Sequence, residues 1–354
     1  MREFGSEFHI AHHKDGYFEQ LRHLKAHGAF LRTGREALLL ASKASEGRTI
    51  LMPAYCCWSM EAPFIQEGYR IIYYRLNADL SVDTDYMLDS IEKHNPSAVL
   101  VVNYYGFTPT NNIVNRIKQI NHNILVIEDF SHCLFSLNEL FNPTVDFYVA
   151  SIRKSIGLPD GAIYLSDIEP TEIAPTNDTD EFLVLRNQAE RLKNIYQYTA
   201  SQQDKSNFLA ALSQAGQLLK NEDVIYPREM SKEGQNIVHN TCSNSFRMAR
   251  MCNYEHLYNI IANNPLLHIP FSPQQTHTAP FALPILVDDR DSVQQMFAAN
   301  GIYAPVLWPI TKEASRVCPN AQNYSEHMLA LPIDQRYNYY DIEELGHRII
   351  SILK

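Results

Sequence analysis

A lysine in the middle of a short polar loop is the residue of this sequence that most directly suggests chemistry. Lys154 follows Arg153 in the stretch 151–162, which lies between two apolar runs. A lysine amine forms a Schiff base with an aldehyde only when burial or a neighbouring cation lowers its pKa. Arg153 and the apolar flanks could do this, although a lysine in a connection that contains Gly and Pro is most often solvated. Schiff-base formation by Lys154 is therefore a hypothesis that the rest of the chain has to support.

Two more polar residues follow another apolar run. Asp129 stands just after the run 123–127, and His132 comes three residues later. A carboxylate and an imidazole beside each other are typical of sites that move protons or hold a cofactor. The simpler alternatives stay open, because Asp129 could cap the following helix and His132 could be a satisfied core or surface histidine.

A helix start supplies the third candidate feature. Thr33, Gly34 and Arg35 precede residues 36–45, which are good helix formers. The first backbone N–H groups of a helix have no partner within the helix and bind anions well. Thr33 as a plain N-cap is the more frequent explanation of such a pattern.

Short apolar runs that alternate with helical stretches indicate how these residues are positioned. Runs that are apolar on both faces are typical of strands in a mainly parallel sheet buried between helical layers, so we expect an α/β architecture. Ligands gather at the carboxyl ends of such strands, where Asp129 and His132 fall. The expected strands cover residues 49–52, 70–74, 98–102, 123–127, 147–150 and 162–165.

The length of 354 residues predicts two domains, since a single core stops growing at roughly 250–300 residues. We expect a large α/β domain over 9–237, in which 183–220 form a helical connecting segment with a solvated charged face. A smaller C-terminal domain is expected over 238–354. Residues 1–8 read like a cloning scar and are excluded from fold reasoning.

Composition narrows the partners and the location. The formal net charge of −10 and the pI near 5.8 argue against binding to nucleic acid or to a membrane surface, so small molecules are expected. No apolar run is long enough to span a membrane, and no export signal is visible. The six cysteines form no CxxC pattern, and Cys56 and Cys57 are adjacent. We therefore expect no disulfide framework, no metal site and a reducing cytoplasm.

The order of several short motifs is more specific than any one of them. They are TGREAL (33–38), MPAY (52–55), NYYGF (103–107), IEDFSH (127–132), SIRK (151–154), SNSFRM (243–248), GIYAPVLWP (301–309) and ALPID (330–334). Together they resemble the DegT/DnrJ/EryC1/StrS family of pyridoxal 5'-phosphate (PLP)-dependent sugar aminotransferases. The resemblance covers nearly the whole chain from residue 30 and keeps the order of the family's motifs.

The resemblance implies a fold-type-I PLP-transferase, which is a three-layer domain with a mainly parallel sheet plus a smaller C-terminal α+β domain. Such enzymes are normally homodimers with active sites at the subunit interface. Lys154 matches the lysine that holds PLP as a Schiff base and later moves a proton. Asp129 matches the carboxylate that pairs with the pyridine nitrogen, and His132 matches a position near the phenolic oxygen. Thr33 to Arg35 match the segment that cradles the phosphate.

Several positions extend or depart from the family's pattern. Ser151 matches a serine that also reaches the phosphate. The aromatic residue that covers the cofactor ring aligns with Cys57, next to Trp58, and we prefer Trp58 as the stacking side chain. The asparagine that one subunit lends to the other aligns with Ser245, with Asn244 one position before it.

The lysine loop and the identity of residue 154 bear on the reaction. The Gly-Gly that usually follows the lysine is here Gly161-Ala162, so the shape of the loop is expected to differ. The presence of Lys154 disfavours the family's dehydratases, which carry histidine there.

The resemblance implies transfer of an amino group from an amino acid, L-glutamate above all, which leaves as 2-oxoglutarate, to a nucleotide-linked keto sugar. The products would be amino sugars for cell-surface polysaccharides or secondary metabolites. Two alternatives remain: an aminotransferase for a non-nucleotide ketone such as a cyclitol, and a catalytically idle regulatory or binding protein on the same fold.

Overall fold

The large sheet carries the strand ends that the sequence singles out. The structure is a computed structural model that describes residues 4–5, 15–177, 179–275 and 278–354. Within these residues, the sheet has seven strands in the order β2-β8-β7-β6-β5-β3-β4. They are β2 (His27–Leu31), β3 (Thr49–Pro53), β4 (Arg70–Tyr74), β5 (Ala98–Val102), β6 (Leu125–Asp129), β7 (Phe147–Ser151) and β8 (Ala162–Ser166).

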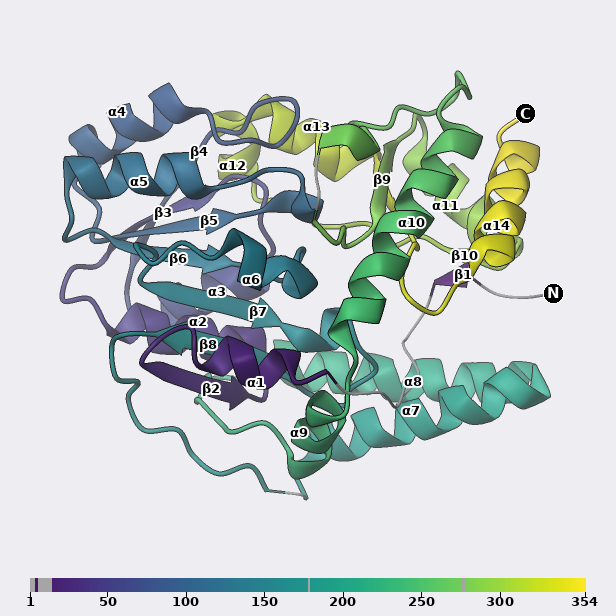
Figure 1. Cartoon of the computed structure of the whole chain (residues 1–354), viewed down its shortest axis with the longest axis horizontal. Coiled ribbons are helices and arrows are strands. Elements are labelled where there is room, and N and C mark those ends of the chain that lie inside the picture. Colours follow the sequence, from purple (N-terminus) through teal and green to yellow (C-terminus); the bar gives the residue numbers. More distant parts are fainter. Residues whose placement is uncertain (1–3, 6–14, 178, 276–277) are drawn as a thin grey trace.

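Strands β3 to β7 pair in parallel, and β8 runs antiparallel to both β7 and β2. Every residue of β5, β7 and β8 is buried, because helices lie on both sides of the sheet (Figure 1). The expected mainly parallel sheet between helical layers is confirmed. The helices of this part are α1 (Tyr17–Arg22), α2 (Gly34–Lys43), α3 (Trp58–Gln66), α4 (Thr84–His94), α5 (Asn111–Ile120), α6 (Leu137–Leu140) and α9 (Lys232–His239).

A helical hairpin follows the sheet in the chain. Helix α7 (Glu181–Thr199) ends at Ala200, whose φ of 49° is left-handed, and α8 (Gln202–Lys220) begins after Ser201. The Ser201 side chain accepts the N–H of Asp204, so it caps α8. The two helices pack against each other along their length, and the hairpin runs beneath the C-terminal part of the molecule (Figure 1).

The C-terminal part is built around a two-stranded antiparallel sheet of β9 (Leu283–Leu286) and β11 (Met328–Leu331). Its long helix α10 (Ser243–Ile261) packs against α14 (Tyr339–Ile352). The remaining helices of this part are α11 (Arg290–Ala299), α12 (Lys312–Val317) and α13 (Pro319–His327). Four short 3-10 turns are also found among the described residues of the whole chain: η1 (Tyr104–Gly106), η2 (Leu134–Ser136), η3 (Ile152–Lys154) and η4 (Pro273–Gln275). The domain boundary at residue 238 stays a prediction.

Two of the residues 1–8, which read like a cloning scar, take part in the fold, and the origin of the segment stays a prediction. Strand β1 (Phe4–Gly5) pairs in parallel with β10 (Ile302–Tyr303). The Phe4 ring is fully buried and lies 5.5 Å from the ring of Tyr337. A large apolar side chain gains stability from such burial whatever the origin of its segment. Residues 1–3 and 6–8 lie outside the described residues.

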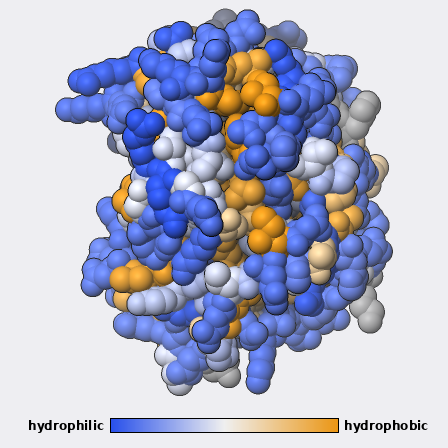
Figure 2. Space-filling model, turned by 90° about the vertical axis from the view of Figure 1, so that its left-hand side faces the viewer, coloured by the Kyte–Doolittle hydropathy of each residue, from blue (hydrophilic) through white to orange (hydrophobic). Residues whose placement is uncertain are grey.

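The side of the molecule away from the C-terminal part is mostly hydrophilic. Figure 2 shows small separate hydrophobic groups on this face and no continuous patch in that view. Scattered exposed apolar side chains of this kind are normal for a folded protein. Among the described residues, no helix combines the length and the apolar character that crossing a membrane requires.

Candidate active site

One cavity collects most of the residues that the sequence singles out. It has a volume of about 450 Å³ and lies at the carboxyl ends of β6 and β7, beside the start of α2. We call it the cofactor cavity. Eight of the eleven predicted site residues line it: Thr33, Gly34, Arg35, Cys57, Trp58, Asp129, Ser151 and Lys154. The other three, His132, Asn244 and Ser245, are not among its lining residues.

Lys154 ends the turn η3, directly after β7. Its Nζ lies 5.7 Å from the centre of the Trp308 ring, within the range of a cation–π contact. The backbone N–H groups of Ile152 and Arg153 donate to the Gly161 carbonyl at 3.0 and 3.3 Å. The lysine is therefore presented to the cavity from a loop that closes on itself.

The segment Pro159-Asp160-Gly161 explains how this loop keeps its shape. The buried Asp160 carboxylate accepts the Ser231 N–H at 2.7 Å and the Ser231 hydroxyl at 2.6 Å. Burial raises the pKa of Asp160 to about 6, although these bonds oppose the shift. Gly161 has a φ of 145°, and a Cβ there would lie 2.7 Å from Met230 Cε. Glycine is required at this position, and the aspartate ties the loop to the segment before α9.

Asp129 is the last residue of β6 and is 7% exposed. Its Oδ1 accepts the Ser131 N–H at 2.8 Å, and the Ser131 hydroxyl accepts the Ser151 N–H at 2.9 Å. The ends of β6 and β7 are thus locked together. The carboxylate makes a local turn contact, as an aspartate with a structural role would, and it also lines the same cavity as Lys154.

The start of α2 is prepared for an anion. The Thr33 hydroxyl is buried and has no hydrogen-bond partner among the described residues. A Cβ on Gly34 would lie 3.6 Å from Ser151 Cβ, so the helix start and the end of β7 are in close contact. Unused helix N–H groups, an unpartnered hydroxyl and Ser151 form a donor set that fits a phosphate group. These residues therefore fit the phosphate end of PLP.

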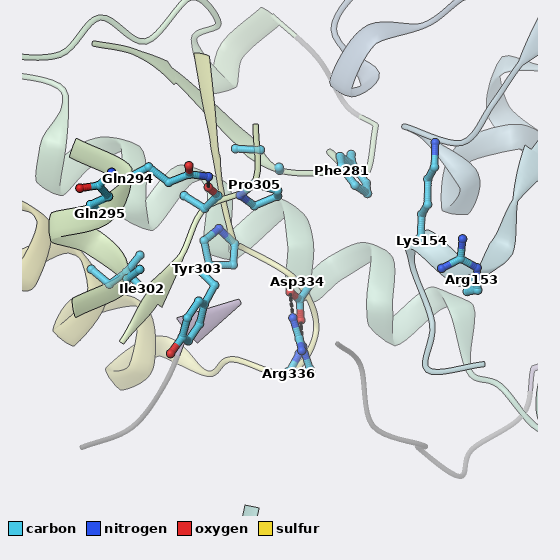
Figure 3. Close-up of a pocket in the computed structure, with 15 residues that line it drawn as sticks. Arg153, Lys154, Phe281, Gln294, Gln295, Ile302, Tyr303, Pro305, Asp334 and Arg336 are labelled. Carbon is cyan, nitrogen blue, oxygen red and sulfur yellow. Dashed lines mark hydrogen bonds and ion pairs between the residues drawn. The ribbon is translucent and has the colours of Figure 1, made fainter. Parts of the chain in front are cut away.

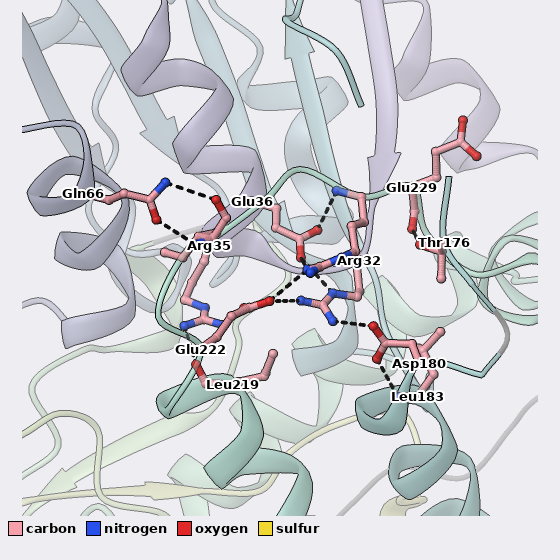
Figure 4. Close-up of polar contacts among 12 residues, drawn as sticks. Arg32, Arg35, Glu36, Gln66, Thr176, Asp180, Leu183, Leu219, Glu222 and Glu229 are labelled. Atoms are coloured by element: carbon pink, nitrogen blue, oxygen red, sulfur yellow. Dashed lines mark hydrogen bonds and ion pairs between the residues drawn. The ribbon is translucent and has the colours of Figure 1, made fainter. Parts of the chain in front are cut away.

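The Arg35 side chain points away from this phosphate position. Its guanidinium donates to the Leu219 carbonyl at 2.6 Å and to Glu222 Oε2 at 2.9 Å (Figure 4). Glu222 Oε1 also accepts from Arg32 and Arg228, at 2.9 Å each. Arg35 can therefore offer an anion its backbone N–H, while its charge is directed to the end of α8.

His132 lies beside the cavity and not in its wall. The ring is 2% exposed and stacks on Phe281 at 4.7 Å and on Trp308 at 5.2 Å. The Tyr105 N–H donates to its Nδ1 at 3.4 Å. Burial, with a further contribution from the charge of Lys154, lowers the pKa of His132 well below its usual value, so the ring is neutral. Its contact with a cofactor stays a prediction.

Trp58 and Cys57 stand together at the start of α3, and both line the cavity. Trp58 is 50% exposed, whereas the Cys57 sulfur lies 2.9 Å from the Ser59 hydroxyl. An indole at the mouth of the cavity has the size and exposure that stacking on a ligand ring requires. The preference for Trp58 as the stacking residue stays a prediction.

A second cavity meets the first at the lysine. It has a volume of about 520 Å³ and shares Arg153 and Lys154 with the cofactor cavity. Figure 3 shows these two residues on one side and Tyr303 on the other. Arg336 donates to both carboxylate oxygens of Asp334, at 2.7 and 2.8 Å. Burial, the largest single influence, would raise the pKa of Asp334, but the charge and hydrogen bonds of Arg336 together with the charge of Arg250 hold that pKa below its usual value. We call this space the substrate cavity.

Arg250 of α10 joins the walls of the two cavities. It is 1% exposed and donates to Gln335 Oε1 at 3.0 Å, to the Phe281 carbonyl at 2.9 Å and to the Ser155 carbonyl at 3.3 Å. Gln335 donates to the same Ser155 carbonyl at 2.8 Å. Ser155 follows Lys154, and Phe281 lines the substrate cavity. One buried guanidinium therefore holds the lysine loop and the opposite wall in register.

The solved structures that this fold resembles include several aminotransferases. PseC from Helicobacter pylori, an aminotransferase in the biosynthesis of pseudoaminic acid, matches with a TM-score of 0.69 and 13% identity over 99% of both chains. A DegT DnrJ EryC1 StrS aminotransferase from Brucella abortus matches with a TM-score of 0.62 and 12% identity, over 97% of this chain and 91% of that one. NtdA from Bacillus subtilis, solved with the bound cofactor PMP, matches with a TM-score of 0.65 and 16% identity, over 97% of this chain and 78% of that one.

The chain has the fold of these aminotransferases. The fold class expected from the sequence is confirmed, and the structural neighbours are of the type that the sequence motifs resemble. No protein-family model matches the sequence, and no curated protein matches it. At identities this low, structural similarity establishes the fold alone, and the function has to be argued from the site.

Sequence reasoning missed several residues at the two cavities. Trp308 lies in a motif that the sequence shows, yet only the structure brings it to Lys154. Gly216, Leu219 and Lys220 of α8 line the cofactor cavity although their segment reads as a solvated connection. The glycine inside a helical pattern was the available signal, because such a residue usually has a packing or functional reason.

Proposed function

We propose that this protein is a PLP-dependent aminotransferase that moves an amino group from L-glutamate to a nucleotide-linked keto sugar, with 2-oxoglutarate as the other product. The observation that carries the proposal is the shared cavity of Lys154, Asp129 and the phosphate-ready start of α2. A lysine, a carboxylate and an anion site match the aldehyde, the pyridine nitrogen and the phosphate of one cofactor. The fold of known aminotransferases supports the same assignment.

Bound PLP would supply an electron sink for breaking the C–H bond next to the transferred nitrogen. Asp129 would keep the pyridine nitrogen protonated, and the lock between β6 and β7 holds this carboxylate in place. Lys154 Nζ would take the proton from the donor carbon and pass it to the cofactor carbon that keeps the nitrogen, as a general acid and base at one atom. The neutral His132, fixed between Phe281 and Trp308, would offer one hydrogen bond without a competing charge.

The substrate cavity is the space for the keto sugar, because it meets the cofactor cavity at Lys154 and none of the phosphate-site residues Thr33, Gly34 and Ser151 lines it. Its wall combines apolar surface from Phe281 and Ile302 with polar groups on Gln294 and Tyr303. A mixed lining of this kind suits a sugar ring, which has apolar faces and polar edges. The half-exposed Trp58 at the mouth of the cofactor cavity is consistent with a second subunit in a homodimer. A cytoplasmic location belongs to the same proposal.

The test combines PLP with L-glutamate and follows the absorbance of the cofactor and the formation of 2-oxoglutarate. The wild-type protein should bleach the cofactor band and release 2-oxoglutarate, and Lys154→Ala should be slower by about 10²- to 10⁴-fold, since it lacks the general acid and base. A variant as fast as the wild type would refute the assignment.

A panel of nucleotide-linked keto sugars and free cyclitols, read by mass spectrometry, then identifies the acceptor. If only cyclitols are converted, the acceptor is a non-nucleotide ketone and not a nucleotide-linked keto sugar. A protein that binds no PLP and ignores glutamate would favour the idle alternative.

A further inference from the structure

The C-terminal end of α8 forms part of the cofactor cavity. Gly216, Leu219 and Lys220 contribute to its lining, and Lys220 lies in the last turn of the helix. These residues come from a hairpin that follows the large sheet in the chain, so they approach the cavity from outside the sheet. The cofactor cavity thus has a lysine within its wall in addition to Lys154.

The charges in this wall suit a dianion. Its charged members are Arg35, Asp129, Arg153, Lys154 and Lys220. The Arg35 guanidinium donates to Glu222 and to the Leu219 carbonyl. In the proposed function, Lys154 bonds to the aldehyde of the cofactor and does not bind its phosphate. Among the described residues, Lys220 makes no ion pair. A phosphate monoester carries about −1.5 to −2 charges near neutral pH and attracts such a cation strongly.

The position of Lys220 is set by the contacts on either side of it. Arg35 holds the Leu219 carbonyl, the residue before Lys220, at 2.6 Å. It also holds Glu222, two residues after Lys220, at 2.9 Å, and Arg32 binds the same carboxylate. Because Arg35 belongs to the first turn of α2, these contacts fasten the end of α8 to the anion-binding helix start (Figure 4).

The segment that is expected to reach the phosphate of a partner subunit does not line the cofactor cavity of its own chain. The Asn244 N–H donates to Asp15 Oδ2 at 2.7 Å, and the Ser245 hydroxyl donates to the Cys242 carbonyl at 2.9 Å. Neither residue lines the cofactor cavity of its own chain. Lys220 is therefore, beside Arg153 of the lysine loop, a cationic side chain that this chain itself can direct to the phosphate.

We propose that Lys220 binds the phosphate of the cofactor, and that Arg35 is a positioning residue that holds Lys220 there. The proposal rests on the proposed function, since it concerns the same cofactor. Lysine binds phosphate as a flexible point charge, which suits a side chain that reaches in from a helix end. If Lys220 served only to favour the C-terminus of α8, its loss would affect the helix and not the phosphate.

The experiment measures the dissociation constants of PLP and of pyridoxal, which has the same ring and aldehyde but no phosphate, with cofactor-free protein. Lys220→Met should weaken PLP binding about 5- to 20-fold, in line with the loss of one charge-assisted contact at an accessible site. The same variant should leave pyridoxal binding unchanged. Lys220→Arg should keep most of the PLP affinity, because the charge is retained.

The matched control is Lys205→Met, on the same helix. Lys205 contacts Tyr303 and does not line the cofactor cavity, so its loss should leave the affinity for PLP unchanged. Arg35→Met should weaken PLP binding in the wild-type background and have little further effect in Lys220→Met, because it acts through Lys220. Circular dichroism checks that each variant is folded.

Equal losses of PLP and pyridoxal affinity in Lys220→Met, or no loss of either, would overturn the assignment of Lys220 while leaving the proposed function intact. Wild-type protein that binds neither compound would overturn the proposed function, and the assignment with it.

Discussion

The two cavities that meet at Lys154 are built in different ways. The cofactor cavity is assembled mainly from strand ends of the large sheet and the starts of α2 and α3, with the end of α8 beside them, and its polar groups are fixed by short contacts such as Ser131 to Asp129. The substrate cavity is lined mostly by separate segments of the C-terminal part, among them α11 and the loop that holds Asp334 and Arg336. Under the proposed function, the sheet would fix the chemistry, while loops of the C-terminal part would shape the space for the substrate.

The largest expected effect comes from breaking the connection between the two cavities. Arg250→Met keeps much of the side chain's volume but leaves the buried carbonyls of Ser155 and Phe281 without this donor. We expect a loss of about 3–5 kcal/mol in the free energy of unfolding, measured by denaturant titration, because several buried polar groups lose a charged partner. The affinities of both cavities should fall in the same variant.

Tyr254→Phe on the same helix is the control for Arg250→Met. It removes one buried hydrogen bond, from the Tyr254 hydroxyl to the Phe271 carbonyl at 2.8 Å. The expected cost is about 1 kcal/mol, with no change at either cavity. Equal losses in the two variants would show that Arg250 does not link the cavities.

Glu128, the neighbour of Asp129, is expected to affect the stability of the fold but not the binding of the cofactor. Its buried carboxyl accepts from Thr110, and burial raises its pKa from 4.5 to about 8. The folded state therefore binds a proton that the unfolded state releases, so this group's contribution to stability is present below pH 4.5 and is lost as the pH rises to about 8. Glu128→Gln should remove most of that fall, measured as the free energy of unfolding against pH.

PLP affinity should stay unchanged in Glu128→Gln, because Glu128 does not line the cofactor cavity. An identical pH profile in the two proteins would contradict the buried neutral carboxyl. A large loss of PLP affinity would show that the two carboxylates act together.

The smallest effects come from filling one cavity at a time. A Cβ on Gly216 would meet no atom within 4 Å, so Gly216→Leu reaches into the cofactor cavity, whereas Ala298→Leu occupies the substrate cavity. The first should weaken PLP binding and the second should raise KM for the keto sugar, each about 10-fold, from the cost of crowding a ligand. Each change should leave the other cavity's ligand unaffected.

Gly216→Ala is the matched control for the cofactor cavity. It adds only a Cβ in open space and favours the helix by up to about 1 kcal/mol, so PLP affinity should not fall. If Ala298→Leu weakened PLP as strongly as it raised KM, the two cavities would not be separate sites.

The contrast between the cavities also explains what sequence could predict. Strands that are apolar on both faces, such as β5 and β7, are visible as runs, and the residue after such a run must lie at the sheet edge. Asp129 and Lys154 follow from that rule, and the structure brings both to one cavity. The anion-ready start of α2 is equally local, since it needs only Thr33 and Gly34 beside a helix.

Contacts between distant segments were out of reach. The sequence predicts that residues 183–220 are helical, but the direction of α8 depends on Arg35 and Glu222, which meet only after folding. The same holds for Arg250, whose partners are separated from it by up to 95 residues in the chain. The burial of Phe4 was missed for a different reason, because its segment reads like a cloning scar and was therefore left out of fold reasoning.

The central claim is that Lys154, and not another lysine of the cofactor cavity, bonds to the cofactor. Reduction of the PLP-loaded protein with borohydride, followed by digestion and mass spectrometry, locates the covalent adduct. The account predicts a single modified peptide with the adduct on Lys154, and none in Lys154→Ala. An adduct on Lys220, or wild-type protein without any adduct, would contradict it.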